Sequence, residues 1–314
     1  MPLVNRENLD VVNTAFFGLL SKLDVQEGTW PMWAGYETGQ AGTSVDVIDI
    51  SGLPRAREWF GTRQVKDLRA YKRNFPIRSW EATIGARVID INQDPHGVVN
   101  SMISPFISQN ASRFYESQMY TALLANPTGV DGVSLMNASH PNVGGSGTSD
   151  NLEAAALTYA LFRTAQQSLM EMKDEYGNPL NVTPSHLLVG TAQEEKAKQI
   201  TGSDKVVGIS DAGEIVAAGG SGVDANAVLL PNYIGGEVAV IVTPEITGNQ
   251  WALMDLTKER KPFYCFEFEA VDGTAMDLPT SDNVFHLDEA LYGLHARFAP
   301  VPGDWHLIHG SVTA

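Results

Sequence analysis

The chain has 314 residues, 43% hydrophobic and 18% charged, which is enough apolar material for one large domain or two modest ones. Its formal net charge of −16 excludes a chain-wide basic surface for nucleic acid. No apolar run of about 18 residues is present and the first residues lack a secretory-signal pattern, so we expect no membrane partner. The single cysteine, Cys265, is expected to be buried and allows no intrachain disulfide, which fits a reducing cytosol.

The first sixth of the chain predicts a helix followed by an extended arm. Apolar side chains recur at three- and four-residue steps over residues 8–24, which is the spacing of an amphipathic helix. A helix so near the terminus is expected to dock either on the chain's own core or on another subunit. Residues 25–54 are rich in glycine and aromatic side chains and predict an extended segment with turns.

Positive charge is concentrated in the next segment. Nine of the 21 basic residues lie between Arg55 and Arg87. Three interpretations remain open: a solvated basic face, an arm that lies across an acidic neighbour, or a patch for nucleic acid. The arm interpretation makes inter-subunit interface candidates of Arg55, Arg57, Trp59, Arg63, Lys66, Arg69, Lys72, Arg73 and Arg78.

A polar strand and a long helix are predicted next. Apolar and polar residues alternate over residues 80–87, which predicts a half-exposed strand within a hairpin-like excursion over 55–92. Asp94 precedes a proline and is therefore a candidate N-cap. An apolar stripe at helical spacing continues to about residue 125, and Pro105 is expected to kink or restart this helix.

The remainder of the chain mixes helices and strands without a regular βαβ period. Asn151 is predicted to cap a helix over about 152–174, and a further helix is predicted from Thr191 to about Ile200. Residues 201–227 form a long glycine-rich stretch that is expected to be mobile or to act at an axis or interface. The order of elements defines an α+β fold. Strands are predicted at 187–189, 237–243, 251–256 and 262–271, followed by a strand-rich stretch over 285–312.

The search for catalytic motifs is mostly negative, with no loop for phosphate binding and no nucleophile motif. His306 and His309 form an H-x-x-H pair, so a metal-assisted hydrolase that uses them with an aspartate is one alternative. The segment alternates like a strand and has no third ligand nearby in sequence, which favours structural histidines. His140, which precedes Pro141, is interpreted as a loop histidine. We therefore expect no catalytic residue, metal or cofactor.

Several colinear segments resemble the major head subunit of Mu-like phages. Two segments near the basic stretch carry the resemblance first, Pro54-Arg55-Ala56-Arg57-Glu58-Trp59-Phe60-Gly61-Thr62-Arg63 and Arg78-Ser79-Trp80-Glu81-Ala82-Thr83-Ile84. The later ones are Ala138-Ser139-His140-Pro141, Trp251-Ala252-Leu253-Met254-Asp255, Arg260-Lys261-Pro262-Phe263, Asp282-Asn283-Val284-Phe285 and Leu291-Tyr292-Gly293. Their shared order spans about residues 50–309, whereas the stretch 204–222 matches no motif of the family.

The resemblance implies an HK97-like phage capsid fold. It also implies a major capsid protein that self-assembles through pentamers and hexamers into an icosahedral shell around the phage double-stranded DNA genome, without sequence-specific binding. The implied regions are an N-terminal arm (1–54), an extended loop formed by a β-hairpin (55–92), a peripheral domain with a long spine helix (93–184), an axial domain (185–245) and a return to the peripheral domain (246–314).

The same resemblance implies further partners and a location. A portal and a decoration protein are expected to act with the shell. The first residues lack the pattern of a long, charged helical leader, so a separate scaffolding protein is expected instead of a built-in one that is cleaved off. The protein would assemble in the cytoplasm of the bacterial host and belong to the virion. An encapsulin-like nanocompartment, which shares the fold but packages enzymes, is the nearer alternative, and the contents of the shell would separate the two.

Overall fold

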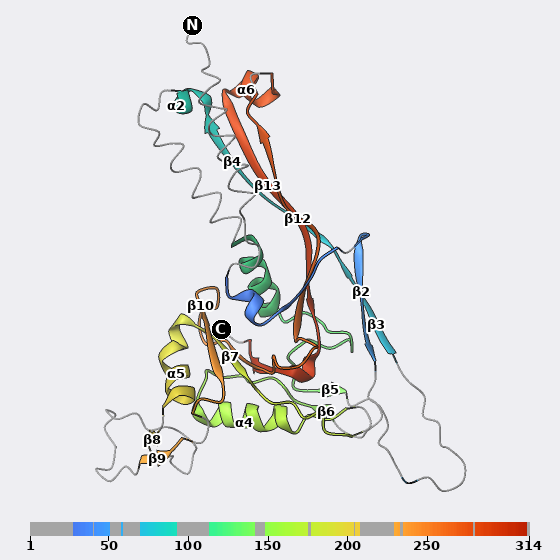
Figure 1. Cartoon of the computed structure of the whole chain (residues 1–314), viewed down its shortest axis with the longest axis vertical. Coiled ribbons are helices and arrows are strands. Elements are labelled where there is room, and N and C mark those ends of the chain that lie inside the picture. Colours follow the sequence, from blue (N-terminus) through green and yellow to red (C-terminus); the bar gives the residue numbers. More distant parts are fainter. Residues whose placement is uncertain are drawn as a thin grey trace.

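The computed structural model shows an elongated molecule with a broad base and a long arm (Figure 1). The residues that it describes are 28–39, 41–50, 58, 70–92, 113–141, 148–174, 177–203, 205–207, 229–232, 235–278 and 280–312. The predicted helix over 8–24, the start of the predicted spine helix at Asp94 and most of the glycine-rich stretch near 204–222 lie outside these residues.

The arm is built on a four-stranded sheet with the strand order β1-β12-β13-β4. Its strands are β1 (Gly35–Glu37), β4 (Arg78–Arg87), β12 (Phe263–Met276) and β13 (Glu289–Pro302). β13 pairs antiparallel with both β12 and β4, and β1 joins the edge in parallel. Two register shifts, between Glu267 and Glu269 and between Glu269 and Asp272, interrupt the β12–β13 pairing along its length. The short helices α2 (Val88–Asn92) and α6 (Asp282–Leu287) lie at the far end of the arm (Figure 1).

The base contains a second sheet with the order β10-β7-β11-β14. Its strands are β7 (His186–Gly190), β10 (Ala239–Thr243), β11 (Trp251–Met254) and β14 (Ile308–Ser311). Leu187, Leu188 and Val189 are fully buried, as expected for a central strand that is covered on both faces. The helices that pack beside this sheet are α4 (Tyr159–Met170) and α5 (Glu194–Gly202), with the short 3-10 turns η2 (Thr191–Gln193) and η3 (Trp305–Leu307) leading into α5 and β14. None of the described helices is long and apolar enough to cross a membrane.

A separate two-stranded hairpin projects from the side of the molecule (Figure 1). It consists of β2 (Ser44–Ile50) and β3 (Ala70–Pro76), which pair antiparallel from Ser44 with Pro76 to Ile50 with Ala70. The remaining described elements are η1 (Trp30–Met32), a helix over residues 113–124, the pair β5 (His140–Pro141) and β6 (Thr148–Ser149), and the pair β8 (Lys205–Val207) and β9 (Leu229–Pro231).

The apolar interior formed by the described residues is divided into three clusters. The main cluster joins the base to the near end of the arm and holds the largest buried aromatic side chains. A second cluster, around Val88, Val284 and Tyr292, lies where α2 and α6 meet the far end of the arm. A third cluster lies where β2 meets β12 and β13, with Val45 packed against Phe266, Ala299 and Val301. β12 and β13 therefore supply residues to all three clusters.

Many of the predicted elements are confirmed. Apolar and polar residues of β4 alternate between half-buried and exposed, as the sequence predicted for residues 80–87. The predicted strands at 187–189, 237–243, 251–256 and 262–271 appear as β7, β10, β11 and β12, and the predicted helix from Thr191 appears as η2 and α5. Residues 113–124 are helical, in agreement with the end of the predicted spine helix. Cys265 is buried, and this burial raises the pKa of its thiol.

The predicted helix over 152–174 is wrong at its start. α4 begins at Tyr159, and its cap is Thr158, whose side-chain oxygen accepts a hydrogen bond from the backbone N–H of Leu161 at 3.2 Å. Asn151 does not cap this helix; it is fully buried, seven residues before Thr158. The chain after it runs beside β14, where the N–H of Glu153 donates to the carbonyl of Gly310 at 2.8 Å.

Two further predictions are corrected by the strand pairing. The sequence predicts residues 80–87 within a hairpin over 55–92, but β4 pairs with β13 in the arm, and the partner of β3 is β2, which lies before that range. Phe285 begins a predicted strand-rich stretch but lies in α6, because the turn between β12 and β13 contains this short helix. The first error concerns a long-range pairing that short-range alternation does not encode, and the second concerns a short helix within a strand-rich stretch.

Candidate subunit-contact surface

Three of the nine predicted contact residues lie within the described part of the chain, on or next to the β2–β3 hairpin. Lys72 and Arg73 lie on β3, and Arg78 is exposed at the start of β4. The other six, Arg55, Arg57, Trp59, Arg63, Lys66 and Arg69, lie outside the described residues, at sequence positions between β2 and β3.

Two of the described basic residues bind the hairpin's own surroundings. The Lys72 ammonium lies 2.7 Å from the carboxylate of Asp46 on β2, and this contact holds the pKa of Asp46 below its usual value. The Arg73 guanidinium donates to the carbonyl of Gly129 at 3.0 Å and lies 5.7 Å from the centre of the Phe75 ring. These contacts link the two hairpin strands to each other and to the body, so Lys72 and Arg73 help to fix the hairpin's direction.

An ionic bridge fixes the end of β2 on the body. The Nη1 of Arg260 lies 2.7 Å from Asp49 on β2 and 3.7 Å from Asp304 in the turn after β13. Burial opposes the charged form of Arg260, but the two carboxylates outweigh it and raise the pKa of the guanidinium. Asp304 also accepts from Nδ1 of His306 at 2.6 Å. Burial acts against it, but the hydrogen bond and charge of His306 hold the pKa of Asp304 below its ordinary value.

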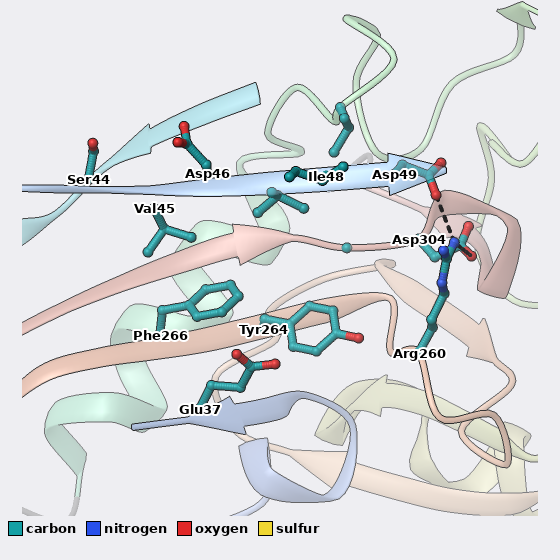
Figure 2. Close-up of a pocket in the computed structure, with 13 residues that line it drawn as sticks. Glu37, Ser44, Val45, Asp46, Ile48, Asp49, Arg260, Tyr264, Phe266 and Asp304 are labelled. Carbon is teal, nitrogen blue, oxygen red and sulfur yellow. Dashed lines mark hydrogen bonds and ion pairs between the residues drawn. The ribbon is translucent and has the colours of Figure 1, made fainter. Parts of the chain in front are cut away.

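A groove of about 370 Å³ lies between β2 and the edge of the arm sheet, and we call it the hairpin groove. Figure 2 shows Val45, Tyr264 and Phe266 facing one another between β2 and β12, with Glu37 of β1 beside them. Asp49 and Asp304 converge on Arg260 at one end (Figure 2). The groove therefore has an apolar floor and a mostly acidic lining. All its lining residues are Glu37, Ser44, Val45, Asp46, Val47, Ile48, Asp49, Val130, Arg260, Tyr264, Phe266, Gly303 and Asp304.

A buried polar cluster joins three distant parts of the chain. The amide of Asn151 donates to the carbonyls of Leu135, Trp305 and Ile308 at 2.9, 3.1 and 3.1 Å. Its side-chain oxygen lies 2.7 Å from the N–H of Asn137, which donates to it, and 3.1 Å from Nε2 of His140. The amide orientation is therefore determined by its partners.

His140 completes this cluster and is not the loop side chain that the sequence suggested. It is fully buried, and its Nδ1 lies 2.7 Å from the carboxylate of Asp131. The ring stacks on Trp305 with centroids 3.9 Å apart and 2° between the planes, and His306 stacks on Trp305 at 3.7 Å. The sequence contained a signal for this role, a histidine next to a proline before a glycine-rich loop, but not its partners. The cluster holds η3 and the loop over 126–141 together.

His306 and His309 do not form a common site. His306 pairs with Asp304, whereas Nε2 of His309 lies 3.4 Å from Glu153 of another segment. Within the described residues, no group of three or more His, Cys, Asp or Glu side chains is placed to hold a metal ion. The two histidines of the H-x-x-H pattern therefore make separate contacts.

The first described residues are anchored on the helix over 113–124. The Glu116 carboxylate accepts from the N–H groups of Thr29 and Trp30 at 3.0–3.1 Å and from the Thr29 hydroxyl at 2.6 Å. Trp33 Nε1 donates to the hydroxyl of Tyr120 at 2.9 Å, and burial raises the pKa of Tyr120 to about 12. This anchor fixes where β1 joins the arm sheet.

The far end of the arm exposes large apolar side chains. Phe285 and Leu287 of α6 are 76% and 65% exposed, and Met276 and Leu278 beside them are also exposed. A water-facing apolar end is typical of a surface that contacts another protein.

Solved structures share this fold. A capsid chain of bacteriophage JBD30, from a capsid decorated with minor capsid protein trimers, aligns with a TM-score of 0.56 and 16% identity, covering 70% of this chain and 91% of that chain. A capsid chain of the native GTA particle aligns with a TM-score of 0.54 and 12% identity, covering 91% and 90%. Another JBD30 capsid chain aligns over 90% of this chain with a TM-score of 0.51 and 12% identity, and this chain spans 64% of its length.

These similarities show the fold: the chain has the mixed helix-and-strand fold of solved phage capsid structures, the HK97-like class of fold. The sequence itself matches the phage capsid protein family over residues 80–306, from β4 to η3. The chain therefore belongs to the phage capsid protein family, which is a structural class and not a class of enzymes. No curated protein matches the sequence.

Proposed function

We propose that this chain is the major capsid protein of a Mu-like tailed phage, whose copies form an icosahedral shell around the double-stranded DNA genome. The observation that carries this proposal is the capsid fold with a hairpin that projects from the body and whose two strands flank, in the sequence, most of the concentrated positive charge of the chain. A shell needs no catalytic residue. It needs contacts between unlike surfaces of neighbouring copies that repeat until they close.

The charge distribution supports a contact between the hairpin and a neighbour's surface. The whole chain carries a net charge of −16, yet nine of its 21 basic residues lie between Arg55 and Arg87. A basic segment that lies across an acidic neighbour gains register and association rate from this complementarity. The acidic remainder is consistent with a container that holds DNA without reading its sequence.

The proposed regions follow the resemblance, with two refinements. The N-terminal arm is residues 1–54, the extended loop 55–92, the peripheral domain 93–184 with its spine helix, the axial domain 185–245, and the return to the peripheral domain 246–314. The pairing of β2 with β3 extends the hairpin backward to Ser44 and ends it at Pro76. The pairing of β4 with β13 supports placing residues 78–87 with the peripheral domain.

The proposal includes pentamers and hexamers of this chain, a separate scaffolding protein, a portal and a decoration protein. The solved JBD30 capsid carries minor capsid protein trimers, which supports a decoration partner for this chain. The shell belongs to the virion and assembles in the host cytoplasm.

Size-exclusion chromatography with negative-stain electron microscopy tests the proposal. The purified chain, expressed alone and with its neighbouring phage genes, is expected to elute as capsomer rings or megadalton shells. Nucleic acid inside the particles supports the capsid, whereas packaged enzyme identifies a nanocompartment. A chain that remains monomeric under both conditions contradicts a shell function.

A further inference from the structure

Building on the proposed shell function, we propose that the hairpin groove binds residues 55–63 of a second copy of this chain, with Trp59 seated on its apolar floor. The groove and this segment are different surfaces of one sequence. Their contact is therefore heterologous and repeats from copy to copy until a ring closes.

The floor of the groove suits a large apolar side chain. Val45 and Phe266 are members of the third apolar cluster and are buried, and Tyr264 is half-buried beside them. Ile48, also in the lining, is 58% exposed. A volume of about 370 Å³ is at the small end of the range for binding pockets, so the groove accepts one or two side chains and not a folded domain.

The charges of the lining specify a basic occupant. It contains four carboxylates, from Glu37, Asp46, Asp49 and Asp304, and one cation, Arg260. Arg260 and Lys72 already pair with three of the carboxylates. Glu37 is exposed and has no ion-pair or hydrogen-bond partner within the described part of the chain. A bound cation beside the apolar floor would therefore meet an unpaired carboxylate.

The segment Arg55-Ala56-Arg57-Glu58-Trp59-Phe60-Gly61-Thr62-Arg63 has this chemistry. It places arginines on both sides of two adjacent aromatic residues. Tryptophan and arginine are the side chains most enriched at the energetic centres of protein contacts. In the proposed contact, Arg57 of one copy pairs with Glu37 of the second copy. Trp59 of the first copy packs on Val45, Tyr264 and Phe266 of the second.

A crosslinking experiment tests the contact between copies. Glu37→Cys and Arg57→Cys chains are prepared separately, mixed, assembled and oxidised. Each chain then carries one engineered cysteine, and the native Cys265 is buried, so a disulfide-linked dimer requires two copies. We expect several-fold more dimer than from a mixture of Glu195→Cys and Arg57→Cys, because Glu195 lies on α5, outside the groove lining. Shells that form without this excess of dimer overturn the inference but leave the shell function intact.

A charge exchange provides a second test that does not depend on a crosslink. Glu37→Arg and Arg57→Glu are each expected to raise the protein concentration needed for assembly about tenfold, and the double variant to restore it to within about threefold of the wild type. The control double variant, Glu195→Arg with Arg57→Glu, is expected to show no recovery. If the control recovers equally, or if the matched pair does not recover, residues 55–63 bind elsewhere. Failure of the wild type to assemble contradicts the shell function instead.

Discussion

At the scale of single residues, the buried imidazole of His309 is the clearest source of pH dependence. Its Nε2 faces Glu153 at 3.4 Å, while its Nδ1 is buried without a hydrogen-bond partner among the described residues. A proton added at Nδ1 would create a buried positive charge with no hydrogen-bond acceptor beside that nitrogen among the described residues. Burial therefore lowers the pKa of His309 to about 4.

Replacement of His309 by Gln is expected to make stability less sensitive to acid. The pKa is about 4 in the folded chain and 6.5 for an unperturbed histidine, so the unfolded chain takes up the proton first as pH falls. The contribution of neutral His309 to the free energy of unfolding is complete above pH 6.5. It is lost as pH falls toward 4, on the order of 3 kcal/mol in total. Urea unfolding of both chains at pH 7 and pH 4.5 measures it. Parallel losses in the two chains would contradict the assignment.

Asn151 is expected to be among the most costly polar residues to replace. Asn151→Ala removes five polar contacts, three of which share the two N–H groups of the amide, and leaves buried carbonyls and Nε2 of His140 without this partner, so it should cost about 3 kcal/mol or more. Asn74 is the matched control, since its amide contacts Ser44 and Asp46 at the exposed surface. Asn74→Ala should cost less than about 1 kcal/mol in the same thermal or urea unfolding experiment. Equal costs would show that the cluster is not structural.

The sequence predicts that Asn151 follows a turn-rich stretch, but it does not predict that this residue is the centre of a buried polar cluster. Asparagine before an apolar run is a normal helix cap, and Thr158, seven positions later, is an equally normal one. What decides between them is the approach of β14 to residues 151–153, a contact between positions about 155 residues apart. Local sequence patterns and helix propensities cannot indicate a contact between residues so far apart in the chain.

At the scale of elements, the hairpin is attached to the body by a few specific contacts. The third apolar cluster packs under β2, Arg73 binds the carbonyl of Gly129, and Arg260 bridges Asp49 and Asp304. The polar contacts among these are at the surface or only partly buried, and the apolar cluster under β2 is small. The hairpin is therefore expected to open locally at a lower free energy than the central strands of the base.

Arg260→Ala is expected to loosen the hairpin without unfolding the protein. The Arg260 side chain is about half exposed, so its ion pairs should contribute less than about 1 kcal/mol to global stability. Hydrogen exchange of the β2 and β3 amides should accelerate several-fold, while exchange of β7 stays unchanged. Lys258→Ala, two residues away, is the matched control, because the Asp49 and Asp304 carboxylates pair with Arg260 and not with Lys258. Unchanged exchange in the hairpin would show that the apolar cluster alone holds it.

The strand elements were well predicted and their partners were not. β2 also alternates, with Val45 and Val47 between polar residues, so a signal for this strand was present in the sequence. Its pairing with β3, across 19 intervening residues, and the pairing of β4 with β13 more than 200 residues away depend on the folded chain. Alternation identifies which face of a strand is apolar but not which strand lies beside it.

At the scale of the whole molecule, the proposed shell function is expected to depend on the relation between the basic segment and the acidic remainder. Reversing the charge at Arg55, Arg57 and Arg63 together is expected to leave a soluble, folded subunit that no longer forms shells. Circular dichroism measures folding, and negative-stain microscopy measures assembly. The control reverses Lys173, Lys196 and Lys258, which changes the net charge by the same amount. Normal shells from the first variant would contradict a role for the basic segment.

The sequence supported the capsid class and the α+β fold because colinear segments, long strands and the distribution of charge are all written locally along the chain. Only part of the candidate site could be predicted from the sequence. The concentration of arginines was visible, whereas the hairpin groove combines β1, β2, β12 and the turn at Asp304. Such a surface exists only after these segments have come together.

The two register shifts in β12 have a consequence for the geometry of a closed particle. They lie between the part of the arm that belongs to the main core and the part with its own apolar cluster. Irregular pairing bends and twists a sheet locally, so the arm has a defined place at which its angle to the base can change. Identical polypeptides at flat and at strongly curved positions of a shell could then differ by a flexure at this point, while the packing on either side of it is preserved.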